Sequence, residues 1–175
     1  MNEIIKAMEE RRSIRKFTAV YPEKAVLEQI AQAGLYAASG MGKQSAMILA
    51  VTDKQLRDKL SEMNRKIGGW NEGFDPFYGA PVVFVVLAQK DCPTHLYDGS
   101  LVMGNLMNAA HSLGLGSIWI HRAKEEFESD EGKEILKSLG IEGEWEGIAN
   151  CAIGYIDGDL PKPAPRKENR LVWAE

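Results

Sequence analysis

Residues 11–16 are the densest group of side chains in this chain that could do chemistry. Their sequence, Arg-Arg-Ser-Ile-Arg-Lys, places four cations and a hydroxyl within six positions of a protein whose formal net charge is −4. Guanidinium groups match phosphate oxygens two at a time, so a compact dianion is a natural ligand for this basic cluster. A solvated patch of cations at a helix C-terminus is the alternative, and these six residues alone do not decide between the two.

Two further segments carry groups suited to a flat, phosphorylated ligand. The 39–45 loop, Ser-Gly-Met-Gly-Lys-Gln-Ser, has small residues that allow a ligand close to the backbone, and its Lys43 and Gln44 offer donors. Arg166 and Lys167 form a basic pair near the C-terminus. Either segment alone is weak. Together with the basic cluster on one acidic domain, they favour a phosphorylated planar ligand.

Several other kinds of site are excluded or disfavoured by the sequence. Residues 114–119 begin as Gly-Leu-Gly, but they have Trp where a dinucleotide fingerprint needs its third glycine, and they lead into a strand. No Walker A sequence occurs. Cys92 and His95 have a metal-like spacing without a second pair, and His111 lies on an apolar helix, where a core histidine is expected. Neither Ser13 nor Ser39 has a histidine near it in sequence to activate it.

Length and composition indicate one globular domain with a real core. The chain has 175 residues, of which 45% are hydrophobic and 26% charged. Its mild acidity argues against a nucleic-acid surface, and we expect no nucleic-acid partner. The N-terminus lacks an apolar signal region, and the longest apolar run, residues 80–88, is too short to span a bilayer. Two distant cysteines predict reduced thiols and a cytoplasmic location.

The hydrophobic pattern predicts helices alternating with buried strands. We expect helices over 2–10, from Pro22, from a Thr52–Gln55 capping box, over about 98–113 and over 130–139, and strands over 46–52, 81–88, 116–121 and 146–156. This alternation indicates an α/β or α+β sandwich around one sheet, formed by a single domain over residues 1–156. Residues 157–175 contain three prolines in five positions and are expected to form an extended arm. The helix over 98–113 is so poor in charge that we expect it to be buried, in the core or against a partner chain.

Residues 11–17, Arg-Arg-Ser-Ile-Arg-Lys-Phe, resemble the R-R-S-x-R-x-F opening of the FMN-dependent nitroreductase family. The 39–45 loop is similar to the family's second segment, usually S-G-x-N-x-Q-P-W, and the resemblance extends through residues 77–81 and 113–119 to the proline-rich arm. It implies an α+β fold, a three-layer α/β/α sandwich with a central, mostly antiparallel sheet. It also implies a homodimer with FMN at the interface and with arms that cross to the partner.

The resemblance assigns site residues by position. The FMN phosphate and ribityl chain would be held by Arg11, Arg12, Ser13 and Arg15, with Arg166 and Lys167 closing on the phosphate. The ring system would be lined by Ser39, Gly40 and Met41, and its pyrimidine edge would accept from Lys43, Gln44 and, as a weaker candidate, Asn64. The remaining contacts along the ring, with backbone N–H groups near N5, would come from Trp119, Ile120, His121 and Arg122. No residue is expected to act as nucleophile or general acid.

The activity implied by the resemblance is hydride transfer from NADH or NADPH through bound FMN to a small electron-poor acceptor (a nitroaromatic, quinone or enone) in a ping-pong cycle. Two other readings stay open: a non-catalytic flavin- or nucleotide-binding regulator, and a dimeric module that docks a phosphorylated partner. The chain departs from the family pattern at Gly42, where Asn is common, and at residues 45–46, where Ser-Ala replaces Pro-Trp. These departures predict a lost contact to the flavin and a wider pocket.

Overall fold

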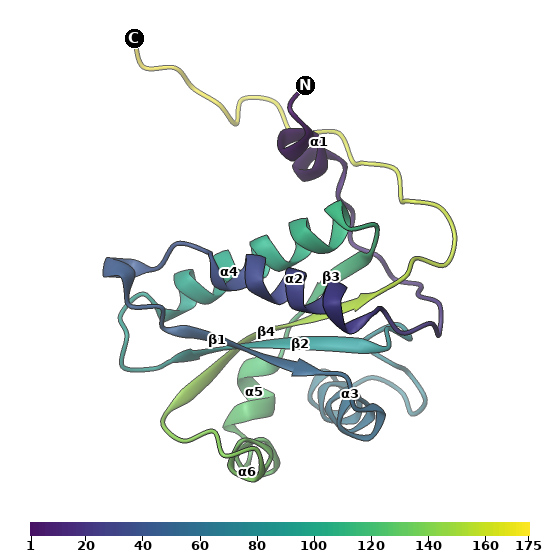
Figure 1. The fold of residues 1–175 in the computed structure, drawn as a ribbon, viewed down its shortest axis with the longest axis vertical. Helices are drawn as coiled ribbons and strands as arrows, with labels where there is room; N and C mark the ends of the chain where they lie inside the picture. Colours follow the sequence, from purple (N-terminus) through teal and green to yellow (C-terminus); the bar gives the residue numbers. More distant parts are fainter.

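A computed structural model describes residues 1–175 as helices packed on both faces of one sheet (Figure 1). The helices are α1 (Glu3–Glu10), α2 (Lys24–Leu35), α3 (Lys54–Gly68), α4 (His95–Ser112), α5 (Ala123–Glu128) and α6 (Asp130–Ser138), with a short 3₁₀ turn, η1 (Gly40–Gly42). The strands are β1 (Ala46–Val51), β2 (Val82–Gln89), β3 (Gly116–Ile120) and β4 (Trp145–Gly154). No helix is both long and apolar enough to cross a membrane.

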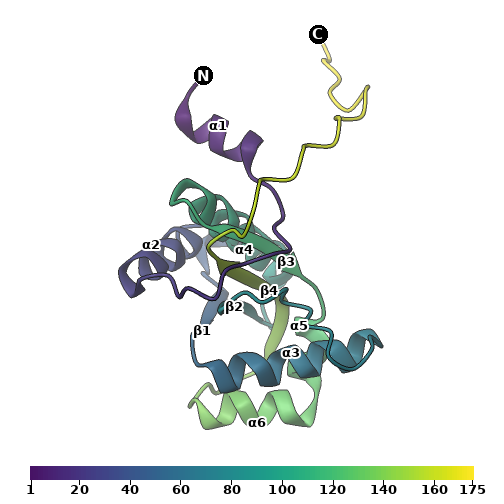
Figure 2. The same ribbon diagram turned by 90° about the vertical axis from the view of Figure 1, so that its right-hand side faces the viewer.

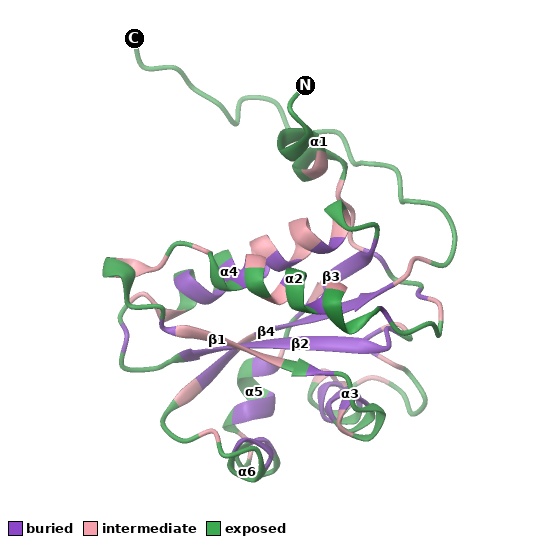
Figure 3. Cartoon of the chain, viewed as in Figure 1, coloured by how far each residue is buried: buried purple, intermediate pink, exposed green.

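The sheet has the order β1-β2-β4-β3, and every pair in it is antiparallel. Helices α2 and α4 cover one face, and α3, α5 and α6 cover the other (Figures 1 and 2). Residues 82–88 of β2 are all buried, because the strand is central and covered on both sides (Figure 3). The predicted three-layer α+β sandwich with an antiparallel sheet is confirmed.

Local capping differs from the sequence predictions at two helix starts. Helix α2 begins at Lys24 after the N-cap Glu23, so Pro22 lies before the helix instead of at its first position. The N-cap of α3 is Asp53, whose carboxylate accepts from the Leu56 backbone N–H at 2.8 Å. Asp53 therefore does the capping that the sequence analysis assigned to the preceding threonine. Helix α5 and the turn η1 were not predicted from the sequence.

The two ends of the chain stand away from the sandwich on its α2–α4 side (Figure 2). Helix α1 has no buried residue, and its apolar Ile4, Ile5 and Met8 are 66%, 50% and 55% exposed. Residues 157–175 form neither helix nor strand and are exposed (Figure 3). Apolar side chains on a helix that nothing covers indicate a surface that another chain could bury.

Candidate functional site

The basic cluster lies beside the edge strand β3. Ser13 forms a parallel bridge with Ser117, and the Ile14 backbone N–H donates to the Ser117 carbonyl at 3.1 Å. Ile14 and Phe17 are 2% and 8% exposed and pack into the core. The isoleucine that interrupts the cations is therefore the anchor that fixes their backbone, while Arg15 points to solvent.

A basic hollow of about 800 Å³ opens between the basic cluster and the arm. Its lining residues are Met8, Glu9, Arg11, Arg12, Ser13, Pro163, Ala164 and Arg166. The structure thus brings four of the predicted phosphate-binding residues together, although the arginine of the arm is distant in sequence. Arg15 and Lys167, the other two predicted cations, do not line this hollow.

Two guanidinium nitrogens at the basic hollow lack partners within the chain. Arg11 Nη1 and Arg12 Nε are buried and donate to no acceptor, although Arg12 Nη1 donates to the Glu9 and Arg11 carbonyls at 2.7 Å each. Leaving a buried donor unpaired costs about 1–3 kcal/mol, and more when the group is charged. These nitrogens fit an anionic ligand that the chain itself does not supply.

The 39–45 loop has an unusual backbone. Met41, Gly42 and Gln44 have φ values of 53°, 66° and 51°, in the left-handed region that residues other than glycine rarely adopt. Met41 is 83% exposed. Such a backbone persists only where the surroundings hold it in place, and it is typical of binding loops.

Asp98, in the first turn of α4, holds this loop. Its carboxylate accepts from the Gly40 backbone N–H at 2.9 Å, from Ser45 Oγ at 2.6 Å and from Thr94 Oγ1 at 3.1 Å. Burial acts to raise the pKa of Asp98, but these hydrogen bonds outweigh it and bring the pKa below its ordinary value. Asp98 therefore stays ionised at the helix N-terminus, where a negative charge is favoured. From the sequence, position 98 was predicted only as the start of a helix.

Residues 119–122 comprise the last two residues of β3 and the two that follow it, and they lead to a second hollow. Ile120 is buried, while the Trp119 indole N–H lies 3.2 Å from Nδ1 of the exposed His121. A hollow of about 470 Å³ is lined here by His121, Arg122, Lys124, Glu125 and Ile148. We call it the His121 hollow. It is separate from the basic hollow, and neither contains a residue of the 39–45 loop.

Asn64 has a different environment from the predicted one. It is fully buried, and its Nδ2 donates to the His121 carbonyl at 2.8 Å and to Glu126 Oε1 at 2.5 Å. Because both donors are used inside the protein, Asn64 is better described as fixing the His121 peptide than as a ligand of a bound ring. Glu126 also accepts from Asn150 at 2.9 Å, and burial raises the pKa of Glu126 to about 7.

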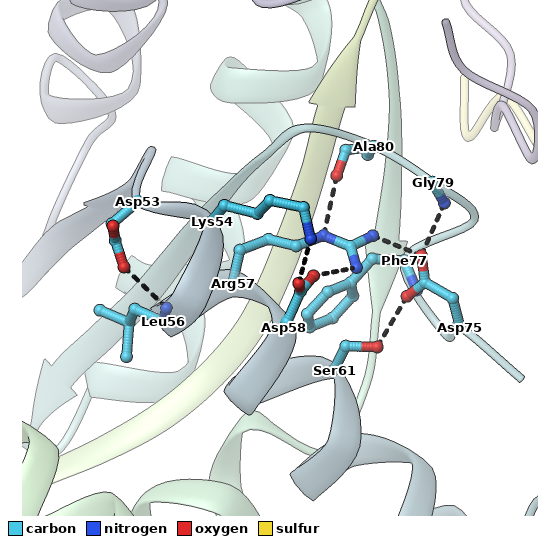
Figure 4. Close-up of polar contacts among 10 residues, drawn as sticks. All are labelled: Asp53, Lys54, Leu56, Arg57, Asp58, Ser61, Asp75, Phe77, Gly79 and Ala80. Atoms are coloured by element: carbon cyan, nitrogen blue, oxygen red, sulfur yellow. Dashed lines mark hydrogen bonds and ion pairs between the residues drawn. The ribbon is translucent and has the colours of Figure 1, made fainter. Parts of the chain in front are cut away.

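A partly buried ion pair fixes the segment before β2 (Figure 4). Arg57 Nε donates to the Ala80 carbonyl at 2.9 Å, and its Nη2 contacts Asp75. Asp75 also accepts from Ser61 Oγ at 2.7 Å and from the Phe77 backbone N–H at 2.9 Å. The irregular segment between α3 and β2 thus has one firmly held end.

Comparison with known proteins assigns the family. The model of the nitroreductase family matches residues 8–155. An NADPH-flavin oxidoreductase of Vibrio harveyi is 29% identical over 100% of this chain and 74% of that protein. An FMN reductase [NAD(P)H] of Bacillus subtilis is 27% identical over 93% of this chain and 70% of that protein. The chain belongs to the nitroreductase family.

Solved structures agree with this assignment. A nitroreductase from Bacteroides fragilis with bound FMN superimposes with a TM-score of 0.89 at 25% identity, covering 100% of both chains. A nitroreductase from Desulfitobacterium hafniense with bound FMN gives the same TM-score and coverage at 26% identity.

Proposed function

We propose that this protein is an FMN-dependent oxidoreductase that takes hydride from NADH or NADPH and passes it to a small electron-poor acceptor. Family membership and the named relatives support the reaction class. The observation that carries the cofactor assignment is the pair of buried, unpartnered guanidinium nitrogens of Arg11 and Arg12 at the basic hollow. They are the donors that a phosphate dianion requires.

The residues of the basic hollow fit the FMN phosphate in charge and in chemistry. Arg11, Arg12 and Arg166 supply guanidinium groups, and Ser13 supplies a hydroxyl. Binding of an anion would satisfy the orphaned donors and relieve the repulsion among the cations. Two exposed cations stay predicted ligands: Lys167, which follows the lining residue Arg166, and Arg15, which is two positions after the lining residue Ser13.

The ring system is assigned to the 39–45 loop and to residues 119–122. Ile148 of the His121 hollow also packs against Gly99, next to Asp98, whose carboxylate holds Gly40. Both ring-binding segments therefore lie near the N-terminal end of α4. The loop would contact the ring through Ser39, Gly40, Met41, Lys43 and Gln44, and the strand end through Trp119, Ile120, His121 and Arg122.

When bound, FMN supplies reversible two-electron chemistry, and the chain supplies position and charge. Lys43 would stabilise negative charge at the pyrimidine edge of the ring. The peptide that follows His121 is held from behind by Asn64, so its N–H keeps a fixed direction. This chemistry needs no nucleophile or general acid from the chain.

A homodimer is part of the proposal. The apolar Ile4 and Met8 of α1 line a hollow of about 400 Å³ against Asn105 and Ala109 of α4, and the outer face of α4 exposes Tyr97 and Leu101 to 73% and 51%. A second subunit would bury these faces, and the arms would cross to it. Such a dimer also explains why the helix over 98–113 is poor in charge. We place the enzyme in the cytoplasm, where its two free cysteines would stay reduced.

The kinetic scheme proposed is ping-pong, because donor and acceptor would use the same face of the ring in turn. It is tested by steady-state rates at several fixed acceptor concentrations, which should give parallel double-reciprocal lines. Intersecting lines would contradict the shared site. The regulator and the phosphorylated-partner module predict no turnover, and the second of these also predicts no bound flavin.

A further inference from the structure

Arg122 has a backbone conformation that costs free energy and a side chain that no acidic group neutralises. Its φ of 82° lies in the left-handed region, at a cost of order 1–3 kcal/mol for a residue other than glycine. Its guanidinium carbon stands 4.3 Å from the centre of the Trp70 ring, and the side chain makes no hydrogen bond or ion pair. Strain of this kind, at an arginine with free donors, points to a functional position.

Trp70 belongs to a row of aromatic rings on the segment before β2. The ring centres of Trp70 and Phe74 are 5.1 Å apart, and those of Phe74 and Tyr78 are 6.0 Å apart. Phe74 is 38% exposed. One end of the row is closed by Gly68, where an added Cβ would stand 2.6 Å from the Trp70 ring. At the other end, the Tyr78 backbone N–H donates to the carbonyl of Asp75, whose side chain forms the ion pair of Figure 4. The row is therefore fixed in place.

Arg122 joins this row to the His121 hollow, which it lines. Lys124 is the other strong cation there, but it is paired with Glu146 at 3.0 Å and with Glu128 at 3.4 Å. Glu125 is the one acidic residue of the lining. A guanidinium stacked on an indole keeps its edge donors free, and that edge can bind a carboxylate in a bidentate manner.

We propose that Arg122, stacked on Trp70, is a specificity-determining residue that favours planar aromatic acceptors carrying a carboxylate or similar anion. The aromatic row that begins at Trp70 would offer apolar contact for the aromatic ring, and Arg122 offers donors for the anion. The inference rests on the proposed function, which places residues 119–122 along the reacting ring. It goes beyond that function by naming the class of acceptor.

The test compares a charged acceptor with an uncharged acceptor of the same shape. For the FMN-loaded protein, kcat/KM is measured with 4-nitrobenzoate and with 4-nitrobenzamide. Arg122→Gln should lower the ratio of kcat/KM for the nitrobenzoate to kcat/KM for the nitrobenzamide by about tenfold or more, which is the contribution of a hydrogen bond to a charged group. Arg122→Lys should be intermediate, because it keeps the charge without the planar fork.

Lys66→Gln is the matched control, since it removes an exposed cation near the end of α3 that pairs only with Glu62. This variant should leave kcat/KM unchanged for both acceptors. A second readout does not depend on turnover: benzoate binding to the oxidised holoprotein, followed by the shift of the visible flavin band. Its Kd should rise about tenfold in Arg122→Gln, whereas the Kd of benzamide should not.

The inference is overturned if Arg122→Gln lowers kcat/KM equally for both acceptors, or if Lys66→Gln lowers kcat/KM for the nitrobenzoate as much as Arg122→Gln does. It is also overturned if the only change in Arg122→Gln is a higher KM for NADPH. The last result would assign Arg122 to the phosphates of the electron donor. If the wild-type holoprotein reduces neither acceptor, the proposed function is wrong, and the benzoate measurement still decides whether Arg122 forms an anion site.

Discussion

Two sets of buried polar groups in this protein lack a complete set of partners, and they call for different explanations. At the basic hollow, the unpaired atoms are guanidinium nitrogens of two residues that line an open cavity, so a ligand bound there could satisfy them. Around Glu126, the unpaired atoms are the side-chain oxygens of Asn64 and Asn150, which lie in the closed interior. No ligand reaches that interior. A proton can satisfy one of these oxygens, because a protonated Glu126 has an O–H that can donate to it.

Arg11→Ala tests the phosphate assignment. The variant should lose about 1.5–3 kcal/mol of FMN binding, which corresponds to a Kd raised by about ten- to a hundredfold, because a charge-assisted hydrogen bond to phosphate is lost. Purified protein should be nearly colourless, and FMN fluorescence titration gives the Kd. Lys6→Ala on the same side of the molecule is the control and should stay yellow. Stoichiometric flavin in Arg11→Ala would show that the phosphate lies elsewhere.

Glu126→Gln tests the buried carboxyl through the pH dependence of stability. The folded-state pKa of about 7 lies above the ordinary value of 4.5. Between these values the folded protein holds a proton that the unfolded chain has released, so the free energy of unfolding falls as pH rises from about 4.5 to about 7. The loss amounts to about 3 kcal/mol and levels off above pH 7.

Glu126→Gln should remove this loss, because the amide is neutral throughout and either asparagine can rotate to accept from it. Denaturant unfolding of the apo protein at pH 5 and pH 8 measures the effect. Glu125→Gln, at the exposed neighbouring residue, is the control and should keep the wild-type dependence of the free energy of unfolding on pH. If Glu126→Gln keeps the wild-type change in the free energy of unfolding between pH 5 and pH 8, Glu126 does not cause that change. Its carboxyl in the wild-type protein would then be ionised already at pH 5.

At the scale of elements, the 39–45 loop is shaped by contacts with α4 more than by its own residues. Asp98 binds Gly40 and Ser45, at the two ends of the loop, and an added Cβ on Gly40 would stand 2.3 Å from Thr94 Oγ1. Ser39 Oγ closes the loop from within by accepting from the Gln44 backbone N–H at 2.9 Å. The loop is thus prepared for a ligand before the ligand arrives, which lowers the entropic cost of binding.

Asp98→Ala should loosen this loop without unfolding the protein. The free energy of unfolding should fall by about 3 kcal/mol, because the Gly40 and Ser45 donors are left unpaired. FMN affinity should fall by about tenfold or more, equivalent to about 1.4 kcal/mol. Asp53→Ala, which removes the N-cap of α3, should cost about 1 kcal/mol of stability and leave FMN affinity unchanged. Equal FMN affinity in the two variants would show that Asp98 is only structural.

The elements show how far the sequence could predict the structure. Continuous apolar runs located all four strands, since a run such as residues 81–88 must be buried. Helix α5 was missed because the left-handed Arg122 that precedes it has no sequence signal: the conformation is usual for glycine. The pairing of Asp98 with the 39–45 loop and of Asn64 with Glu126 was also missed. These contacts span 53 to 62 positions, and no local pattern reports them.

At the scale of the whole molecule, helix α1 and the arm are the features that the proposed partner subunit would explain. Helix α1 and the arm both stand away from the sandwich, and Arg11 and Arg12 of the basic cluster line the basic hollow together with Arg166 of the arm. A partner subunit would bury the apolar side chains of α1 and α4 and would hold the arm in place. Dimerisation and cofactor binding should therefore be coupled.

Ile4→Glu with Met8→Glu tests this coupling. Two charges on the exposed apolar face of α1 should convert the dimer to a monomer in light-scattering chromatography and should lower the flavin content. Glu3→Gln with Lys6→Gln on the same helix is the control and should remain dimeric. A variant that stays dimeric and yellow would contradict the role of α1.

The arm is tested by deleting residues 159–175 in comparison with Arg166→Ala. The substitution should raise the Kd for FMN by about tenfold, because one charge-assisted hydrogen bond is lost, and it should leave the dimer intact. The deletion should weaken both FMN binding and the dimer, measured by fluorescence titration and by light scattering. If the deletion has no larger effect than the substitution, the arm does not cross to the partner.

Anaerobic titration of the purified, FMN-loaded protein with NADH or NADPH tests the central claim most directly. One equivalent of at least one nicotinamide should bleach the visible flavin band completely, and addition of 4-nitrobenzamide or a quinone should restore it. A protein that holds flavin but is not bleached by either nicotinamide would be a binding protein and not an oxidoreductase. That result would contradict the account.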